Sequence, residues 1–95
     1  MEFKVIISPR AIRDLGQIVR YISLDDSKAV QRFGYTLIDE ALSLSKLPDR
    51  GRLVPELDDG ITREIIHQPY RIVYRVNHEQ KCALVSRFWH GARLL

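Results

Sequence analysis

The chain has 95 residues, of which 45% are hydrophobic and 28% are charged. That length suits one compact domain over residues 1–95, and it excludes multidomain enzymes and cofactor folds built from two halves. The composition is too apolar for intrinsic disorder. The formal net charge of +3 is modest, so it favours nucleic acid or an acidic protein as a partner only where the cations cluster.

The cations do cluster, in the second half of the chain. Six arginines lie between residues 50 and 87, and Arg93 follows just beyond them. Acidic residues gather earlier, at Asp25, Asp26, Asp39 and Glu40. This separation of charge favours an acidic partner for the C-terminal half.

Several classes of protein are excluded by what the sequence lacks. Cys82 is the only cysteine, which excludes an intramolecular disulfide and fits a reducing cytoplasm. The sequence shows no signal-peptide pattern, no apolar run of the ~18 residues that a membrane span needs, and no cysteine or histidine spacing typical of a metal site. We therefore expect a cytoplasmic protein with no membrane partner, no metal ion and no cofactor.

The N-terminal half predicts one strand followed by two helices. Phe3, Val5 and Ile7 alternate along the chain, as in a short strand with one buried face. Ser8 and Pro9 then favour a helix start, because serine can cap the first turn and proline has no N–H to leave unpaired there. Apolar side chains at spacings of three and four predict helices over about 9–22 and 30–46. Their short connection predicts an antiparallel helical hairpin.

The C-terminal half predicts a long loop and three strands. The loop covers residues 47–60, and the strand-forming runs cover residues 62–68, 71–76 and 82–89 with hairpin-length connections. The predicted fold is therefore α+β, in the order β-α-α-β-β-β, with a small, mainly antiparallel sheet. The helical hairpin should pack on one face of that sheet and leave the other face open.

Two arginines share one face of the middle predicted strand. Arg71 and Arg75 each lie two residues from Val73. Because side chains alternate along a strand, both arginines point to the same face. If the preceding turn is centred on residues 69–70, Glu64 lies opposite Arg75, where the two could form an ion pair on a solvated face. Arg71, at the strand start, is the stronger candidate for binding phosphate, whose geometry a guanidinium matches.

Two further segments carry residues suited to chemistry. His90 can exchange a proton near neutral pH, and Trp89 beside it can stack on an exposed base. The structural alternative is that Trp89 covers the core and His90 is an ordinary residue at a strand end. Glu56 follows Pro55 in the predicted loop, where it is either held near the sheet by its apolar neighbours or, as for most loop glutamates, solvated.

Four motifs in this order resemble the RelE/ParE superfamily of bacterial toxins across nearly the whole chain. They are Ala11-x-x-Asp14-Leu15-x-x-Ile18-x-x-Tyr21-Ile22, Gly51-Arg52-x-x-Pro55-Glu56-Leu57, Tyr70-Arg71-Ile72-Val73-Tyr74-Arg75-Val76 and His90-Gly91-Ala92-Arg93. The resemblance implies the toxin half of a type II toxin–antitoxin pair. It also implies a cognate antitoxin that wraps the helices and the sheet in a hetero-oligomer.

The resemblance allows two activities. RelE-like members cleave messenger RNA at the ribosome, and their ribonuclease branch implies catalytic roles for Glu56, Arg71 and His90. Glu56 would take the proton of a 2′-hydroxyl, Arg71 would stabilise the pentavalent phosphate, and His90 would protonate the leaving oxygen without a metal ion. The RNA-binding residues would be Arg63, Arg75, Arg87, Trp89 and Arg93.

ParE-like members instead inhibit DNA gyrase without catalysis. This alternative is favoured by the long helical hairpin and by Thr62 and Glu64, which stand where RelE carries strand lysines. Arg63, Arg87 and Arg93 could equally form a basic face that holds ribosomal RNA or seat an acidic segment of the antitoxin. A toxin that has lost its activity and only binds its antitoxin is a third possibility. The sequence favours the ribonuclease first.

Overall fold

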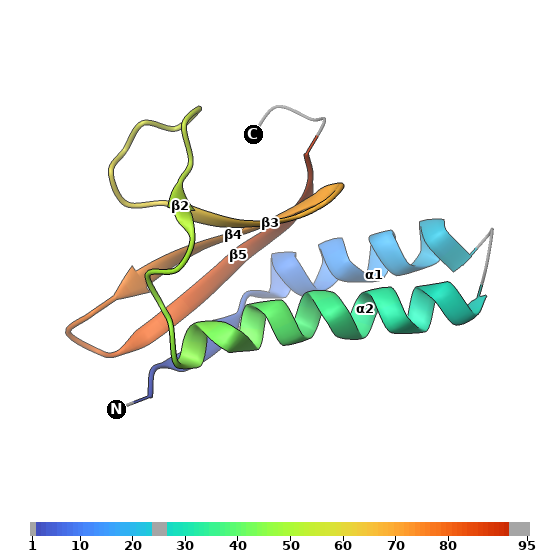
Figure 1. The fold of residues 1–95 in the computed structure, drawn as a ribbon, viewed down its shortest axis with the longest axis horizontal. Coiled ribbons are helices and arrows are strands. Elements are labelled where there is room, and N and C mark those ends of the chain that lie inside the picture. The colour runs from blue at the N-terminus through green and yellow to red at the C-terminus, as the bar shows by residue number, and fades with distance from the viewer. Residues whose placement is uncertain (1, 24–26, 92–95) are drawn as a thin grey trace.

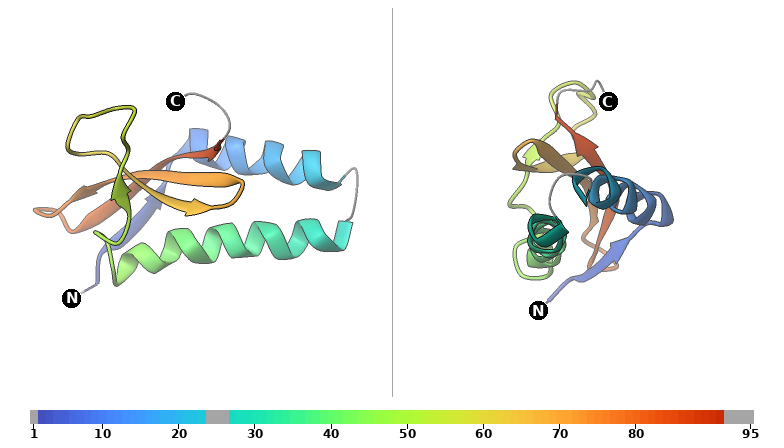
Figure 2. Two further views of the ribbon diagram at one scale, coloured as in Figure 1. Left: turned by 45° about the horizontal axis from the view of Figure 1, so that its top comes forward. Right: turned by 90° about the vertical axis from the view of Figure 1, so that its right-hand side faces the viewer.

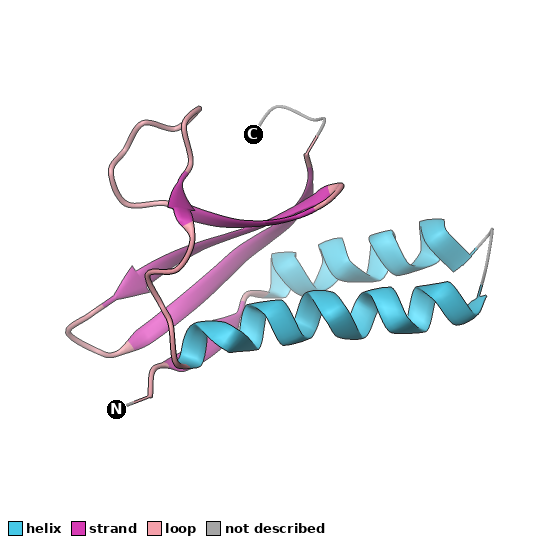
Figure 3. Ribbon diagram, viewed as in Figure 1, coloured by secondary structure: helices cyan, strands magenta, loops and turns pink. Residues whose placement is uncertain are grey.

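The computed structural model describes residues 2–23 and 27–91. Within them lie two helices and a five-stranded sheet (Figure 1; Figure 3). In chain order the elements are β1 (Lys4–Ile7), α1 (Pro9–Ser23), α2 (Ser27–Leu42), a 3₁₀ turn (Ser43–Ser45), β2 (Arg52–Leu53), β3 (Arg63–His67), β4 (Tyr70–Asn77) and β5 (Cys82–His90). The strand order is β1-β5-β4-β3-β2, with β1 parallel to β5 and the other neighbours antiparallel. The predicted α+β fold is confirmed.

Two details of the predicted elements were wrong. The predicted loop over residues 47–60 contains the additional strand β2, whose two residues pair with β3 and are too few to show strand periodicity in the sequence. The second helix ends at Leu42, because the chain tightens into the 3₁₀ turn before residue 46.

The start of α1 is built as its sequence predicts. The Ser8 hydroxyl accepts the Ala11 N–H at 3.0 Å and donates to the Ser86 carbonyl at 3.1 Å. The Ser8 N–H also donates to the Val85 carbonyl at 2.9 Å, which extends the β1–β5 ladder. One residue therefore ends the first strand, caps the first helix and ties both to the last strand.

The hydrophobic core lies between the helices and one face of the sheet. Ile72 and Tyr74 of β4 and Phe88 of β5 meet Leu37 and Leu44 in this core, and all five are at most 2% exposed. Figure 2 shows α1 and α2 side by side on this face in two further views. Because side chains alternate along a strand, Arg71 and Val73 point to the opposite face.

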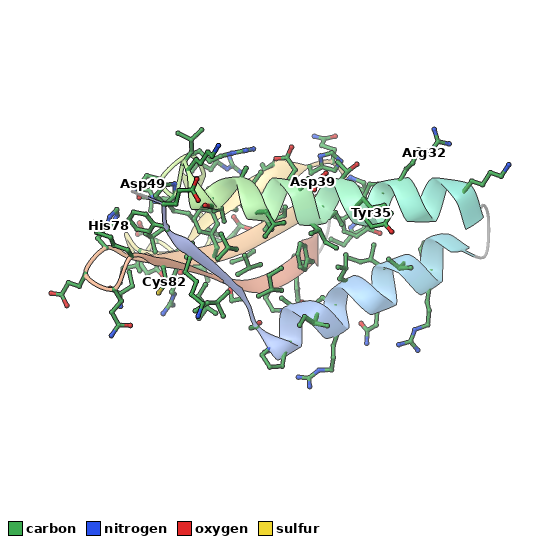
Figure 4. The ribbon with its side chains drawn as sticks, turned by 90° about the horizontal axis from the view of Figure 1, so that it is seen from below. Arg32, Tyr35, Asp39, Asp49, His78 and Cys82 are labelled. Atoms are coloured by element: carbon green, nitrogen blue, oxygen red, sulfur yellow. The ribbon has the colours of Figure 1, made fainter. Side chains whose placement is uncertain are left out.

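Polar and aromatic side chains are exposed along α2. Arg32, Tyr35 and Asp39 are exposed along α2 (Figure 4). The same view shows Asp49 and His78 at one end of the molecule, where Asp49 Oδ1 lies 3.2 Å from His78 Nε2. Neither helix within the described residues is both long and apolar enough to span a membrane.

The register of the β3–β4 hairpin differs from the predicted one. His67 pairs with Tyr70, so the turn is centred on Gln68 and Pro69 and Glu64 lies opposite Val73, not opposite Arg75. Proline has no N–H to donate to a ladder, which favours its place in the turn. The shift is two residues, so each side chain keeps its predicted face but changes its neighbours.

Candidate functional site

Arg71 lies at the centre of the candidate site, on the sheet face turned away from the helices. Its Nη1 donates to Glu56 Oε2 at 2.6 Å, and its Nη2 donates to Glu56 Oε1 at 2.9 Å. Glu56 belongs to the loop between β2 and β3, which Figure 1 shows across the sheet from α1 and α2. Two parallel bonds between a guanidinium and a carboxylate form a strong, charge-assisted pair. Two of the predicted catalytic residues are therefore in direct contact.

A second carboxylate binds the same guanidinium. Glu64 Oε1 lies 2.6 Å from Arg71 Nε, and Arg71 Nη2 donates to Glu64 Oε2 at 3.3 Å. Arg52 Nε of β2 donates to Glu64 Oε2 at 2.7 Å. The Glu64 side chain is 0% exposed, and a carboxylate so deeply buried needs cations beside it. We call Arg52, Glu56, Glu64 and Arg71 the arginine–carboxylate cluster.

The Glu56–Arg71 pair fixes the charge of both residues. Hydrogen bonding from Arg71 lowers the pKa of Glu56 from 4.5 to about 2. The hydrogen bonds to Glu56 in turn raise the pKa of Arg71 above its ordinary value. At neutral pH Glu56 is therefore ionised, with each oxygen already bonded to a donor. A carboxylate held in this way is a poor general base.

The loop that carries Glu56 is anchored where it rejoins the sheet. Asp59 Oδ1 accepts the Thr62 N–H at 2.8 Å, and the Thr62 hydroxyl donates to Asp59 Oδ2 at 2.7 Å. The Val54 N–H donates to the Thr62 carbonyl at 2.9 Å and closes the base of the loop. Gly60, which lies between Asp59 and Thr62 in the chain, has a φ of 69°, a backbone conformation that favours glycine.

Gly51 brings β2 against the buried part of the cluster. Its N–H donates to the Tyr74 hydroxyl at 2.9 Å. A Cβ atom at this position would lie 2.6 Å from that hydroxyl and 2.6 Å from the Glu64 carbonyl oxygen. Residue 51 must therefore be glycine for the strands to approach, which gives the Gly51-Arg52 motif a structural reason.

His90, the third predicted catalytic residue, does not share the sheet face of Arg71. It pairs with Tyr70 in the β4–β5 ladder, and its ring lies edge-on to the Tyr70 ring at 5.3 Å between centroids. Arg71 pairs with Trp89 and points to the other face. Both His90 and Arg71 nevertheless line a pocket of about 340 Å³ at the end of the sheet. Beside it the Gly91 N–H donates to the Pro69 carbonyl at 2.7 Å.

Within the described residues, the six arginines from Arg50 to Arg87 each form an ion pair with a carboxylate. Besides the Arg71–Glu64 pair, the ion pairs are Arg50–Glu40 at 2.6 Å, Arg52–Glu64 at 2.7 Å, Arg63–Asp49 at 3.8 Å, Arg71–Glu56 at 2.6 Å, Arg75–Asp59 at 3.6 Å and Arg87–Asp14 at 2.6 Å. Arg75 thus turns to the loop, not to Glu64 as the sequence suggested. Because each of these six arginines lies beside a carboxylate, its positive charge is partly offset at close range.

The other predicted RNA-binding residues have separate positions. Arg87 lies over the Trp89 ring, with Cζ 4.3 Å from the ring centroid. Both residues line a second, larger pocket of about 560 Å³ between α1 and the end of β5, which His90 also lines. Arg93 lies outside the described residues.

Sequence reasoning missed two of the residues that organise this surface. Glu64 was assigned to Arg75, although its place on the same face as Arg71 was available from the alternation of the strands. Asp14 belongs to a quoted motif, but nothing in its spacing indicated that it pairs with Arg87. Across residues 2–23 and 27–91, no three His, Cys, Asp or Glu side chains gather as metal ligands would.

The site thus combines a helical hairpin on one face of a five-stranded sheet with an arginine–carboxylate cluster on the other face. The sequence model of the family described as "ParE toxin of type II toxin-antitoxin system, parDE" matches residues 5–95. Toxin RelE1 of Caulobacter vibrioides is 35% identical over 92 residues, which span 96% of each chain.

Solved structures share the fold. The toxin–antitoxin complex RelBE2 from Mycobacterium tuberculosis superposes with a TM-score of 0.70 at 22% identity, covering 95% of this chain and 99% of that one. The chromosomal ParDE system from P. aeruginosa gives a TM-score of 0.76 at 17% identity, covering 94% and 96%. The chain belongs to the RelE/ParE superfamily and is the toxin component of a type II toxin–antitoxin system, as its motifs predicted.

Proposed function

We propose that this toxin acts by binding a protein target, DNA gyrase, as the ParE-like branch of its superfamily does, and that it does not cleave RNA. This reverses the order that the sequence favoured. The observation that supports the reversal is the arrangement of Arg71, whose single guanidinium is bonded to both Glu56 and Glu64.

Metal-independent RNA cleavage needs a free base, a cation facing the phosphate and an acid on the same side. Here the base candidate Glu56 is bonded to the cation candidate Arg71, and its lowered pKa of about 2 weakens it further. The two glutamates of the arginine–carboxylate cluster balance its two arginines, so the cluster as it stands carries no net positive charge for a phosphate. The acid candidate His90 has its ring on the Tyr70 side of the sheet.

One observation favours the ribonuclease as a second candidate. Arg71 and His90 line the same pocket, and Glu56 is within hydrogen-bonding distance of Arg71. If an RNA substrate displaced Glu56 from Arg71, the three groups that the resemblance implies would surround that pocket.

The two activities are separated by assaying one preparation of the full-length toxin in two ways. Gyrase supercoiling and messenger-RNA cleavage in a reconstituted translation reaction are measured for the wild type and for His90→Ala. We expect supercoiling to be blocked with the RNA intact, and the block to survive His90→Ala. New RNA ends that vanish in His90→Ala would overturn the proposal in favour of the ribonuclease. If neither reaction is affected, both fail and a toxin without activity remains.

We also propose a cognate antitoxin as the partner that neutralises this chain in a toxin–antitoxin hetero-oligomer. Membership of a type II toxin family supports this partner. Co-purification with the product of a short neighbouring reading frame tests it, and growth restored by co-expression is the expected result. Unrestored growth despite equal expression would contradict that pairing.

A further inference from the structure

We infer that one face of α1 binds the phosphate backbone of duplex DNA. The face is made of exposed side chains that each carry N–H or O–H donors, and we call it the α1 donor face: Arg10, Arg13, Gln17, Arg20 and Tyr21. These positions fall within about 100° of the helix circumference. The choice of DNA as the source of the phosphates rests on the proposed function, because gyrase acts on duplex DNA.

Arg10 and Arg13 differ from the arginines of the sheet, each of which lies beside a carboxylate. Neither Arg10 nor Arg13 forms an ion pair with another residue that the structure describes. The acidic residue of α1 is Asp14, whose side chain is 11% exposed and whose two oxygens are bonded to Arg87. The fold therefore engages the one carboxylate of α1 elsewhere, so positive potential remains on the α1 donor face.

The length of the α1 donor face suits a short row of phosphates. The helix rises by about 15 Å from Arg10 to Arg20, and one strand of B-DNA presents about four phosphates over that length. Arg20 Nη2 would lie 4.0 Å from a Cβ atom on Gly16, so its guanidinium extends over the preceding turn of the helix. Figure 4 shows side chains of α1 that point away from α2, where a duplex could approach them.

The chemistry of the α1 donor face favours backbone phosphates. Arginine, glutamine and tyrosine are all donors that proteins use to contact DNA phosphates. Single-stranded nucleic acid is instead held by several aromatic side chains that stack on its bases, and Tyr21 is the one aromatic member of this face. A protein partner would favour an apolar centre. The exposed Ile12 lies outside the face, about 80° or more around the helix from each of its members.

The test is the binding of a labelled duplex of about 20 base pairs to the full-length toxin, measured by fluorescence anisotropy at about 50 mM salt. One variant combines Arg10→Gln with Arg13→Gln. The matched control combines Lys46→Gln with Lys81→Gln, two exposed residues beside the 3₁₀ turn and in the β4–β5 turn. Figure 1 shows α1 leading away from these two turns.

We expect the arginine variant to bind the duplex about tenfold or more weakly than the wild type, because two phosphate contacts are lost. The control should lose less than about threefold. The slope of log affinity against log salt should also become shallower by about 2 in the arginine variant alone. Equal losses in the two variants, an unchanged slope, or no binding of the duplex by the wild type would each overturn the inference.

A conservative variant separates charge from a change in folding. Arg10→Lys combined with Arg13→Lys keeps two cations that can contact phosphates as point charges, so it should restore most of the binding. Circular dichroism checks that each variant is folded, as expected for exposed positions. Binding that stays as weak as in the glutamine variant would contradict a role through charge.

Two further measurements keep this inference distinct from the proposed function. Duplex binding is measured without gyrase, and supercoiling is measured with the wild type. If the wild type binds DNA through Arg10 and Arg13 but leaves supercoiling unaffected, the α1 donor face stands and the gyrase target fails. If supercoiling is blocked while the arginine variant binds DNA as the wild type does, only the inference fails. Tighter binding of a single-stranded RNA of equal length would overturn duplex DNA as the ligand.

Discussion

Arg87 and Asp14, which are 73 residues apart in the chain, form a two-point ion pair that joins the last strand to the first helix. Arg87 Nε and Nη2 donate to the two oxygens of Asp14 at 2.6 and 3.0 Å. The same carboxylate accepts the Phe88 N–H at 3.2 Å. β1 ends at Ile7, opposite Val85. Beyond that point the Asp14 carboxylate, in place of a neighbouring strand, accepts a backbone hydrogen bond from β5.

Replacing that carboxylate should destabilise the fold. Asp14→Asn removes the charge while keeping an oxygen of similar position, and the two side chains of the pair are only 22% and 11% exposed. We expect a loss of about 1–3 kcal/mol in the free energy of unfolding, measured by urea denaturation. Asp39→Asn, on the exposed side of α2, should change it by less than about 0.5 kcal/mol. Equal effects of the two substitutions would contradict the role of Asp14.

A methyl group at Gly51 should be costly. Gly51→Ala would bring a Cβ to within 2.6 Å of the Tyr74 hydroxyl, and the hydrogen bond between residue 51 and Tyr74 would be broken. We expect a loss of about 2 kcal/mol or more and a lower melting temperature. Gly16→Ala in the middle of α1, where a Cβ meets no heavy atom closer than 4.0 Å, should instead stabilise by up to about 1 kcal/mol. If both substitutions changed the free energy of unfolding in the same direction, the close approach of Tyr74 to residue 51 would not be the reason for glycine at that position.

Arg71 and Arg75 allow the same substitution to be compared on one strand face. Arg71→Gln leaves the buried Glu64 with one cation fewer, so we expect a loss of about 3 kcal/mol or more in the free energy of unfolding. Arg75 is 60% exposed beside Asp59, and Arg75→Gln should cost less than about 1 kcal/mol. Urea midpoints measured in parallel test this difference, and similar midpoints would mean that the cluster does not depend on Arg71.

The lowered pKa of Glu56 predicts an acid-sensitive contribution to stability. A carboxyl whose pKa is lower in the folded state stabilises the fold above its unfolded pKa, and this contribution is lost as pH falls through the folded value. For Glu56 that window runs from 4.5 down to about 2. Glu56→Gln should therefore flatten the fall in unfolding free energy across this window.

The flattening should be partial, because the pKa of Asp59 is also lowered, from 3.8 to about 2, chiefly by its hydrogen bonds with Thr62. Glu79→Gln is the charge-matched control and should keep the wild-type slope. Denaturant titrations at several pH values give the slopes. An unchanged slope in Glu56→Gln would mean that Glu56 does not form its ion pair in solution.

Residue patterns within short segments of the sequence determined most of the fold. Alternation over residues 3–7, spacings of three and four in the helices and the Ser8-Pro9 start each depend on neighbours within one or two turns of chain. Those contacts are encoded in short segments, so helices, strands and the face that each side chain occupies could be predicted. The order of the four motifs was sufficient to identify the superfamily. The two-residue strand β2 was missed because a pattern so short has no period.

Only the tertiary structure decided which charges meet. A two-residue change in the β3–β4 register moved Glu64 from Arg75 to Arg71, and the folding of a loop brought Glu56 onto the same guanidinium. Such pairings depend on register, loop path and burial, which no local spacing specifies. The sequence by itself therefore showed that this half of the chain is rich in arginine. The structure placed a carboxylate beside each of the six arginines from Arg50 to Arg87.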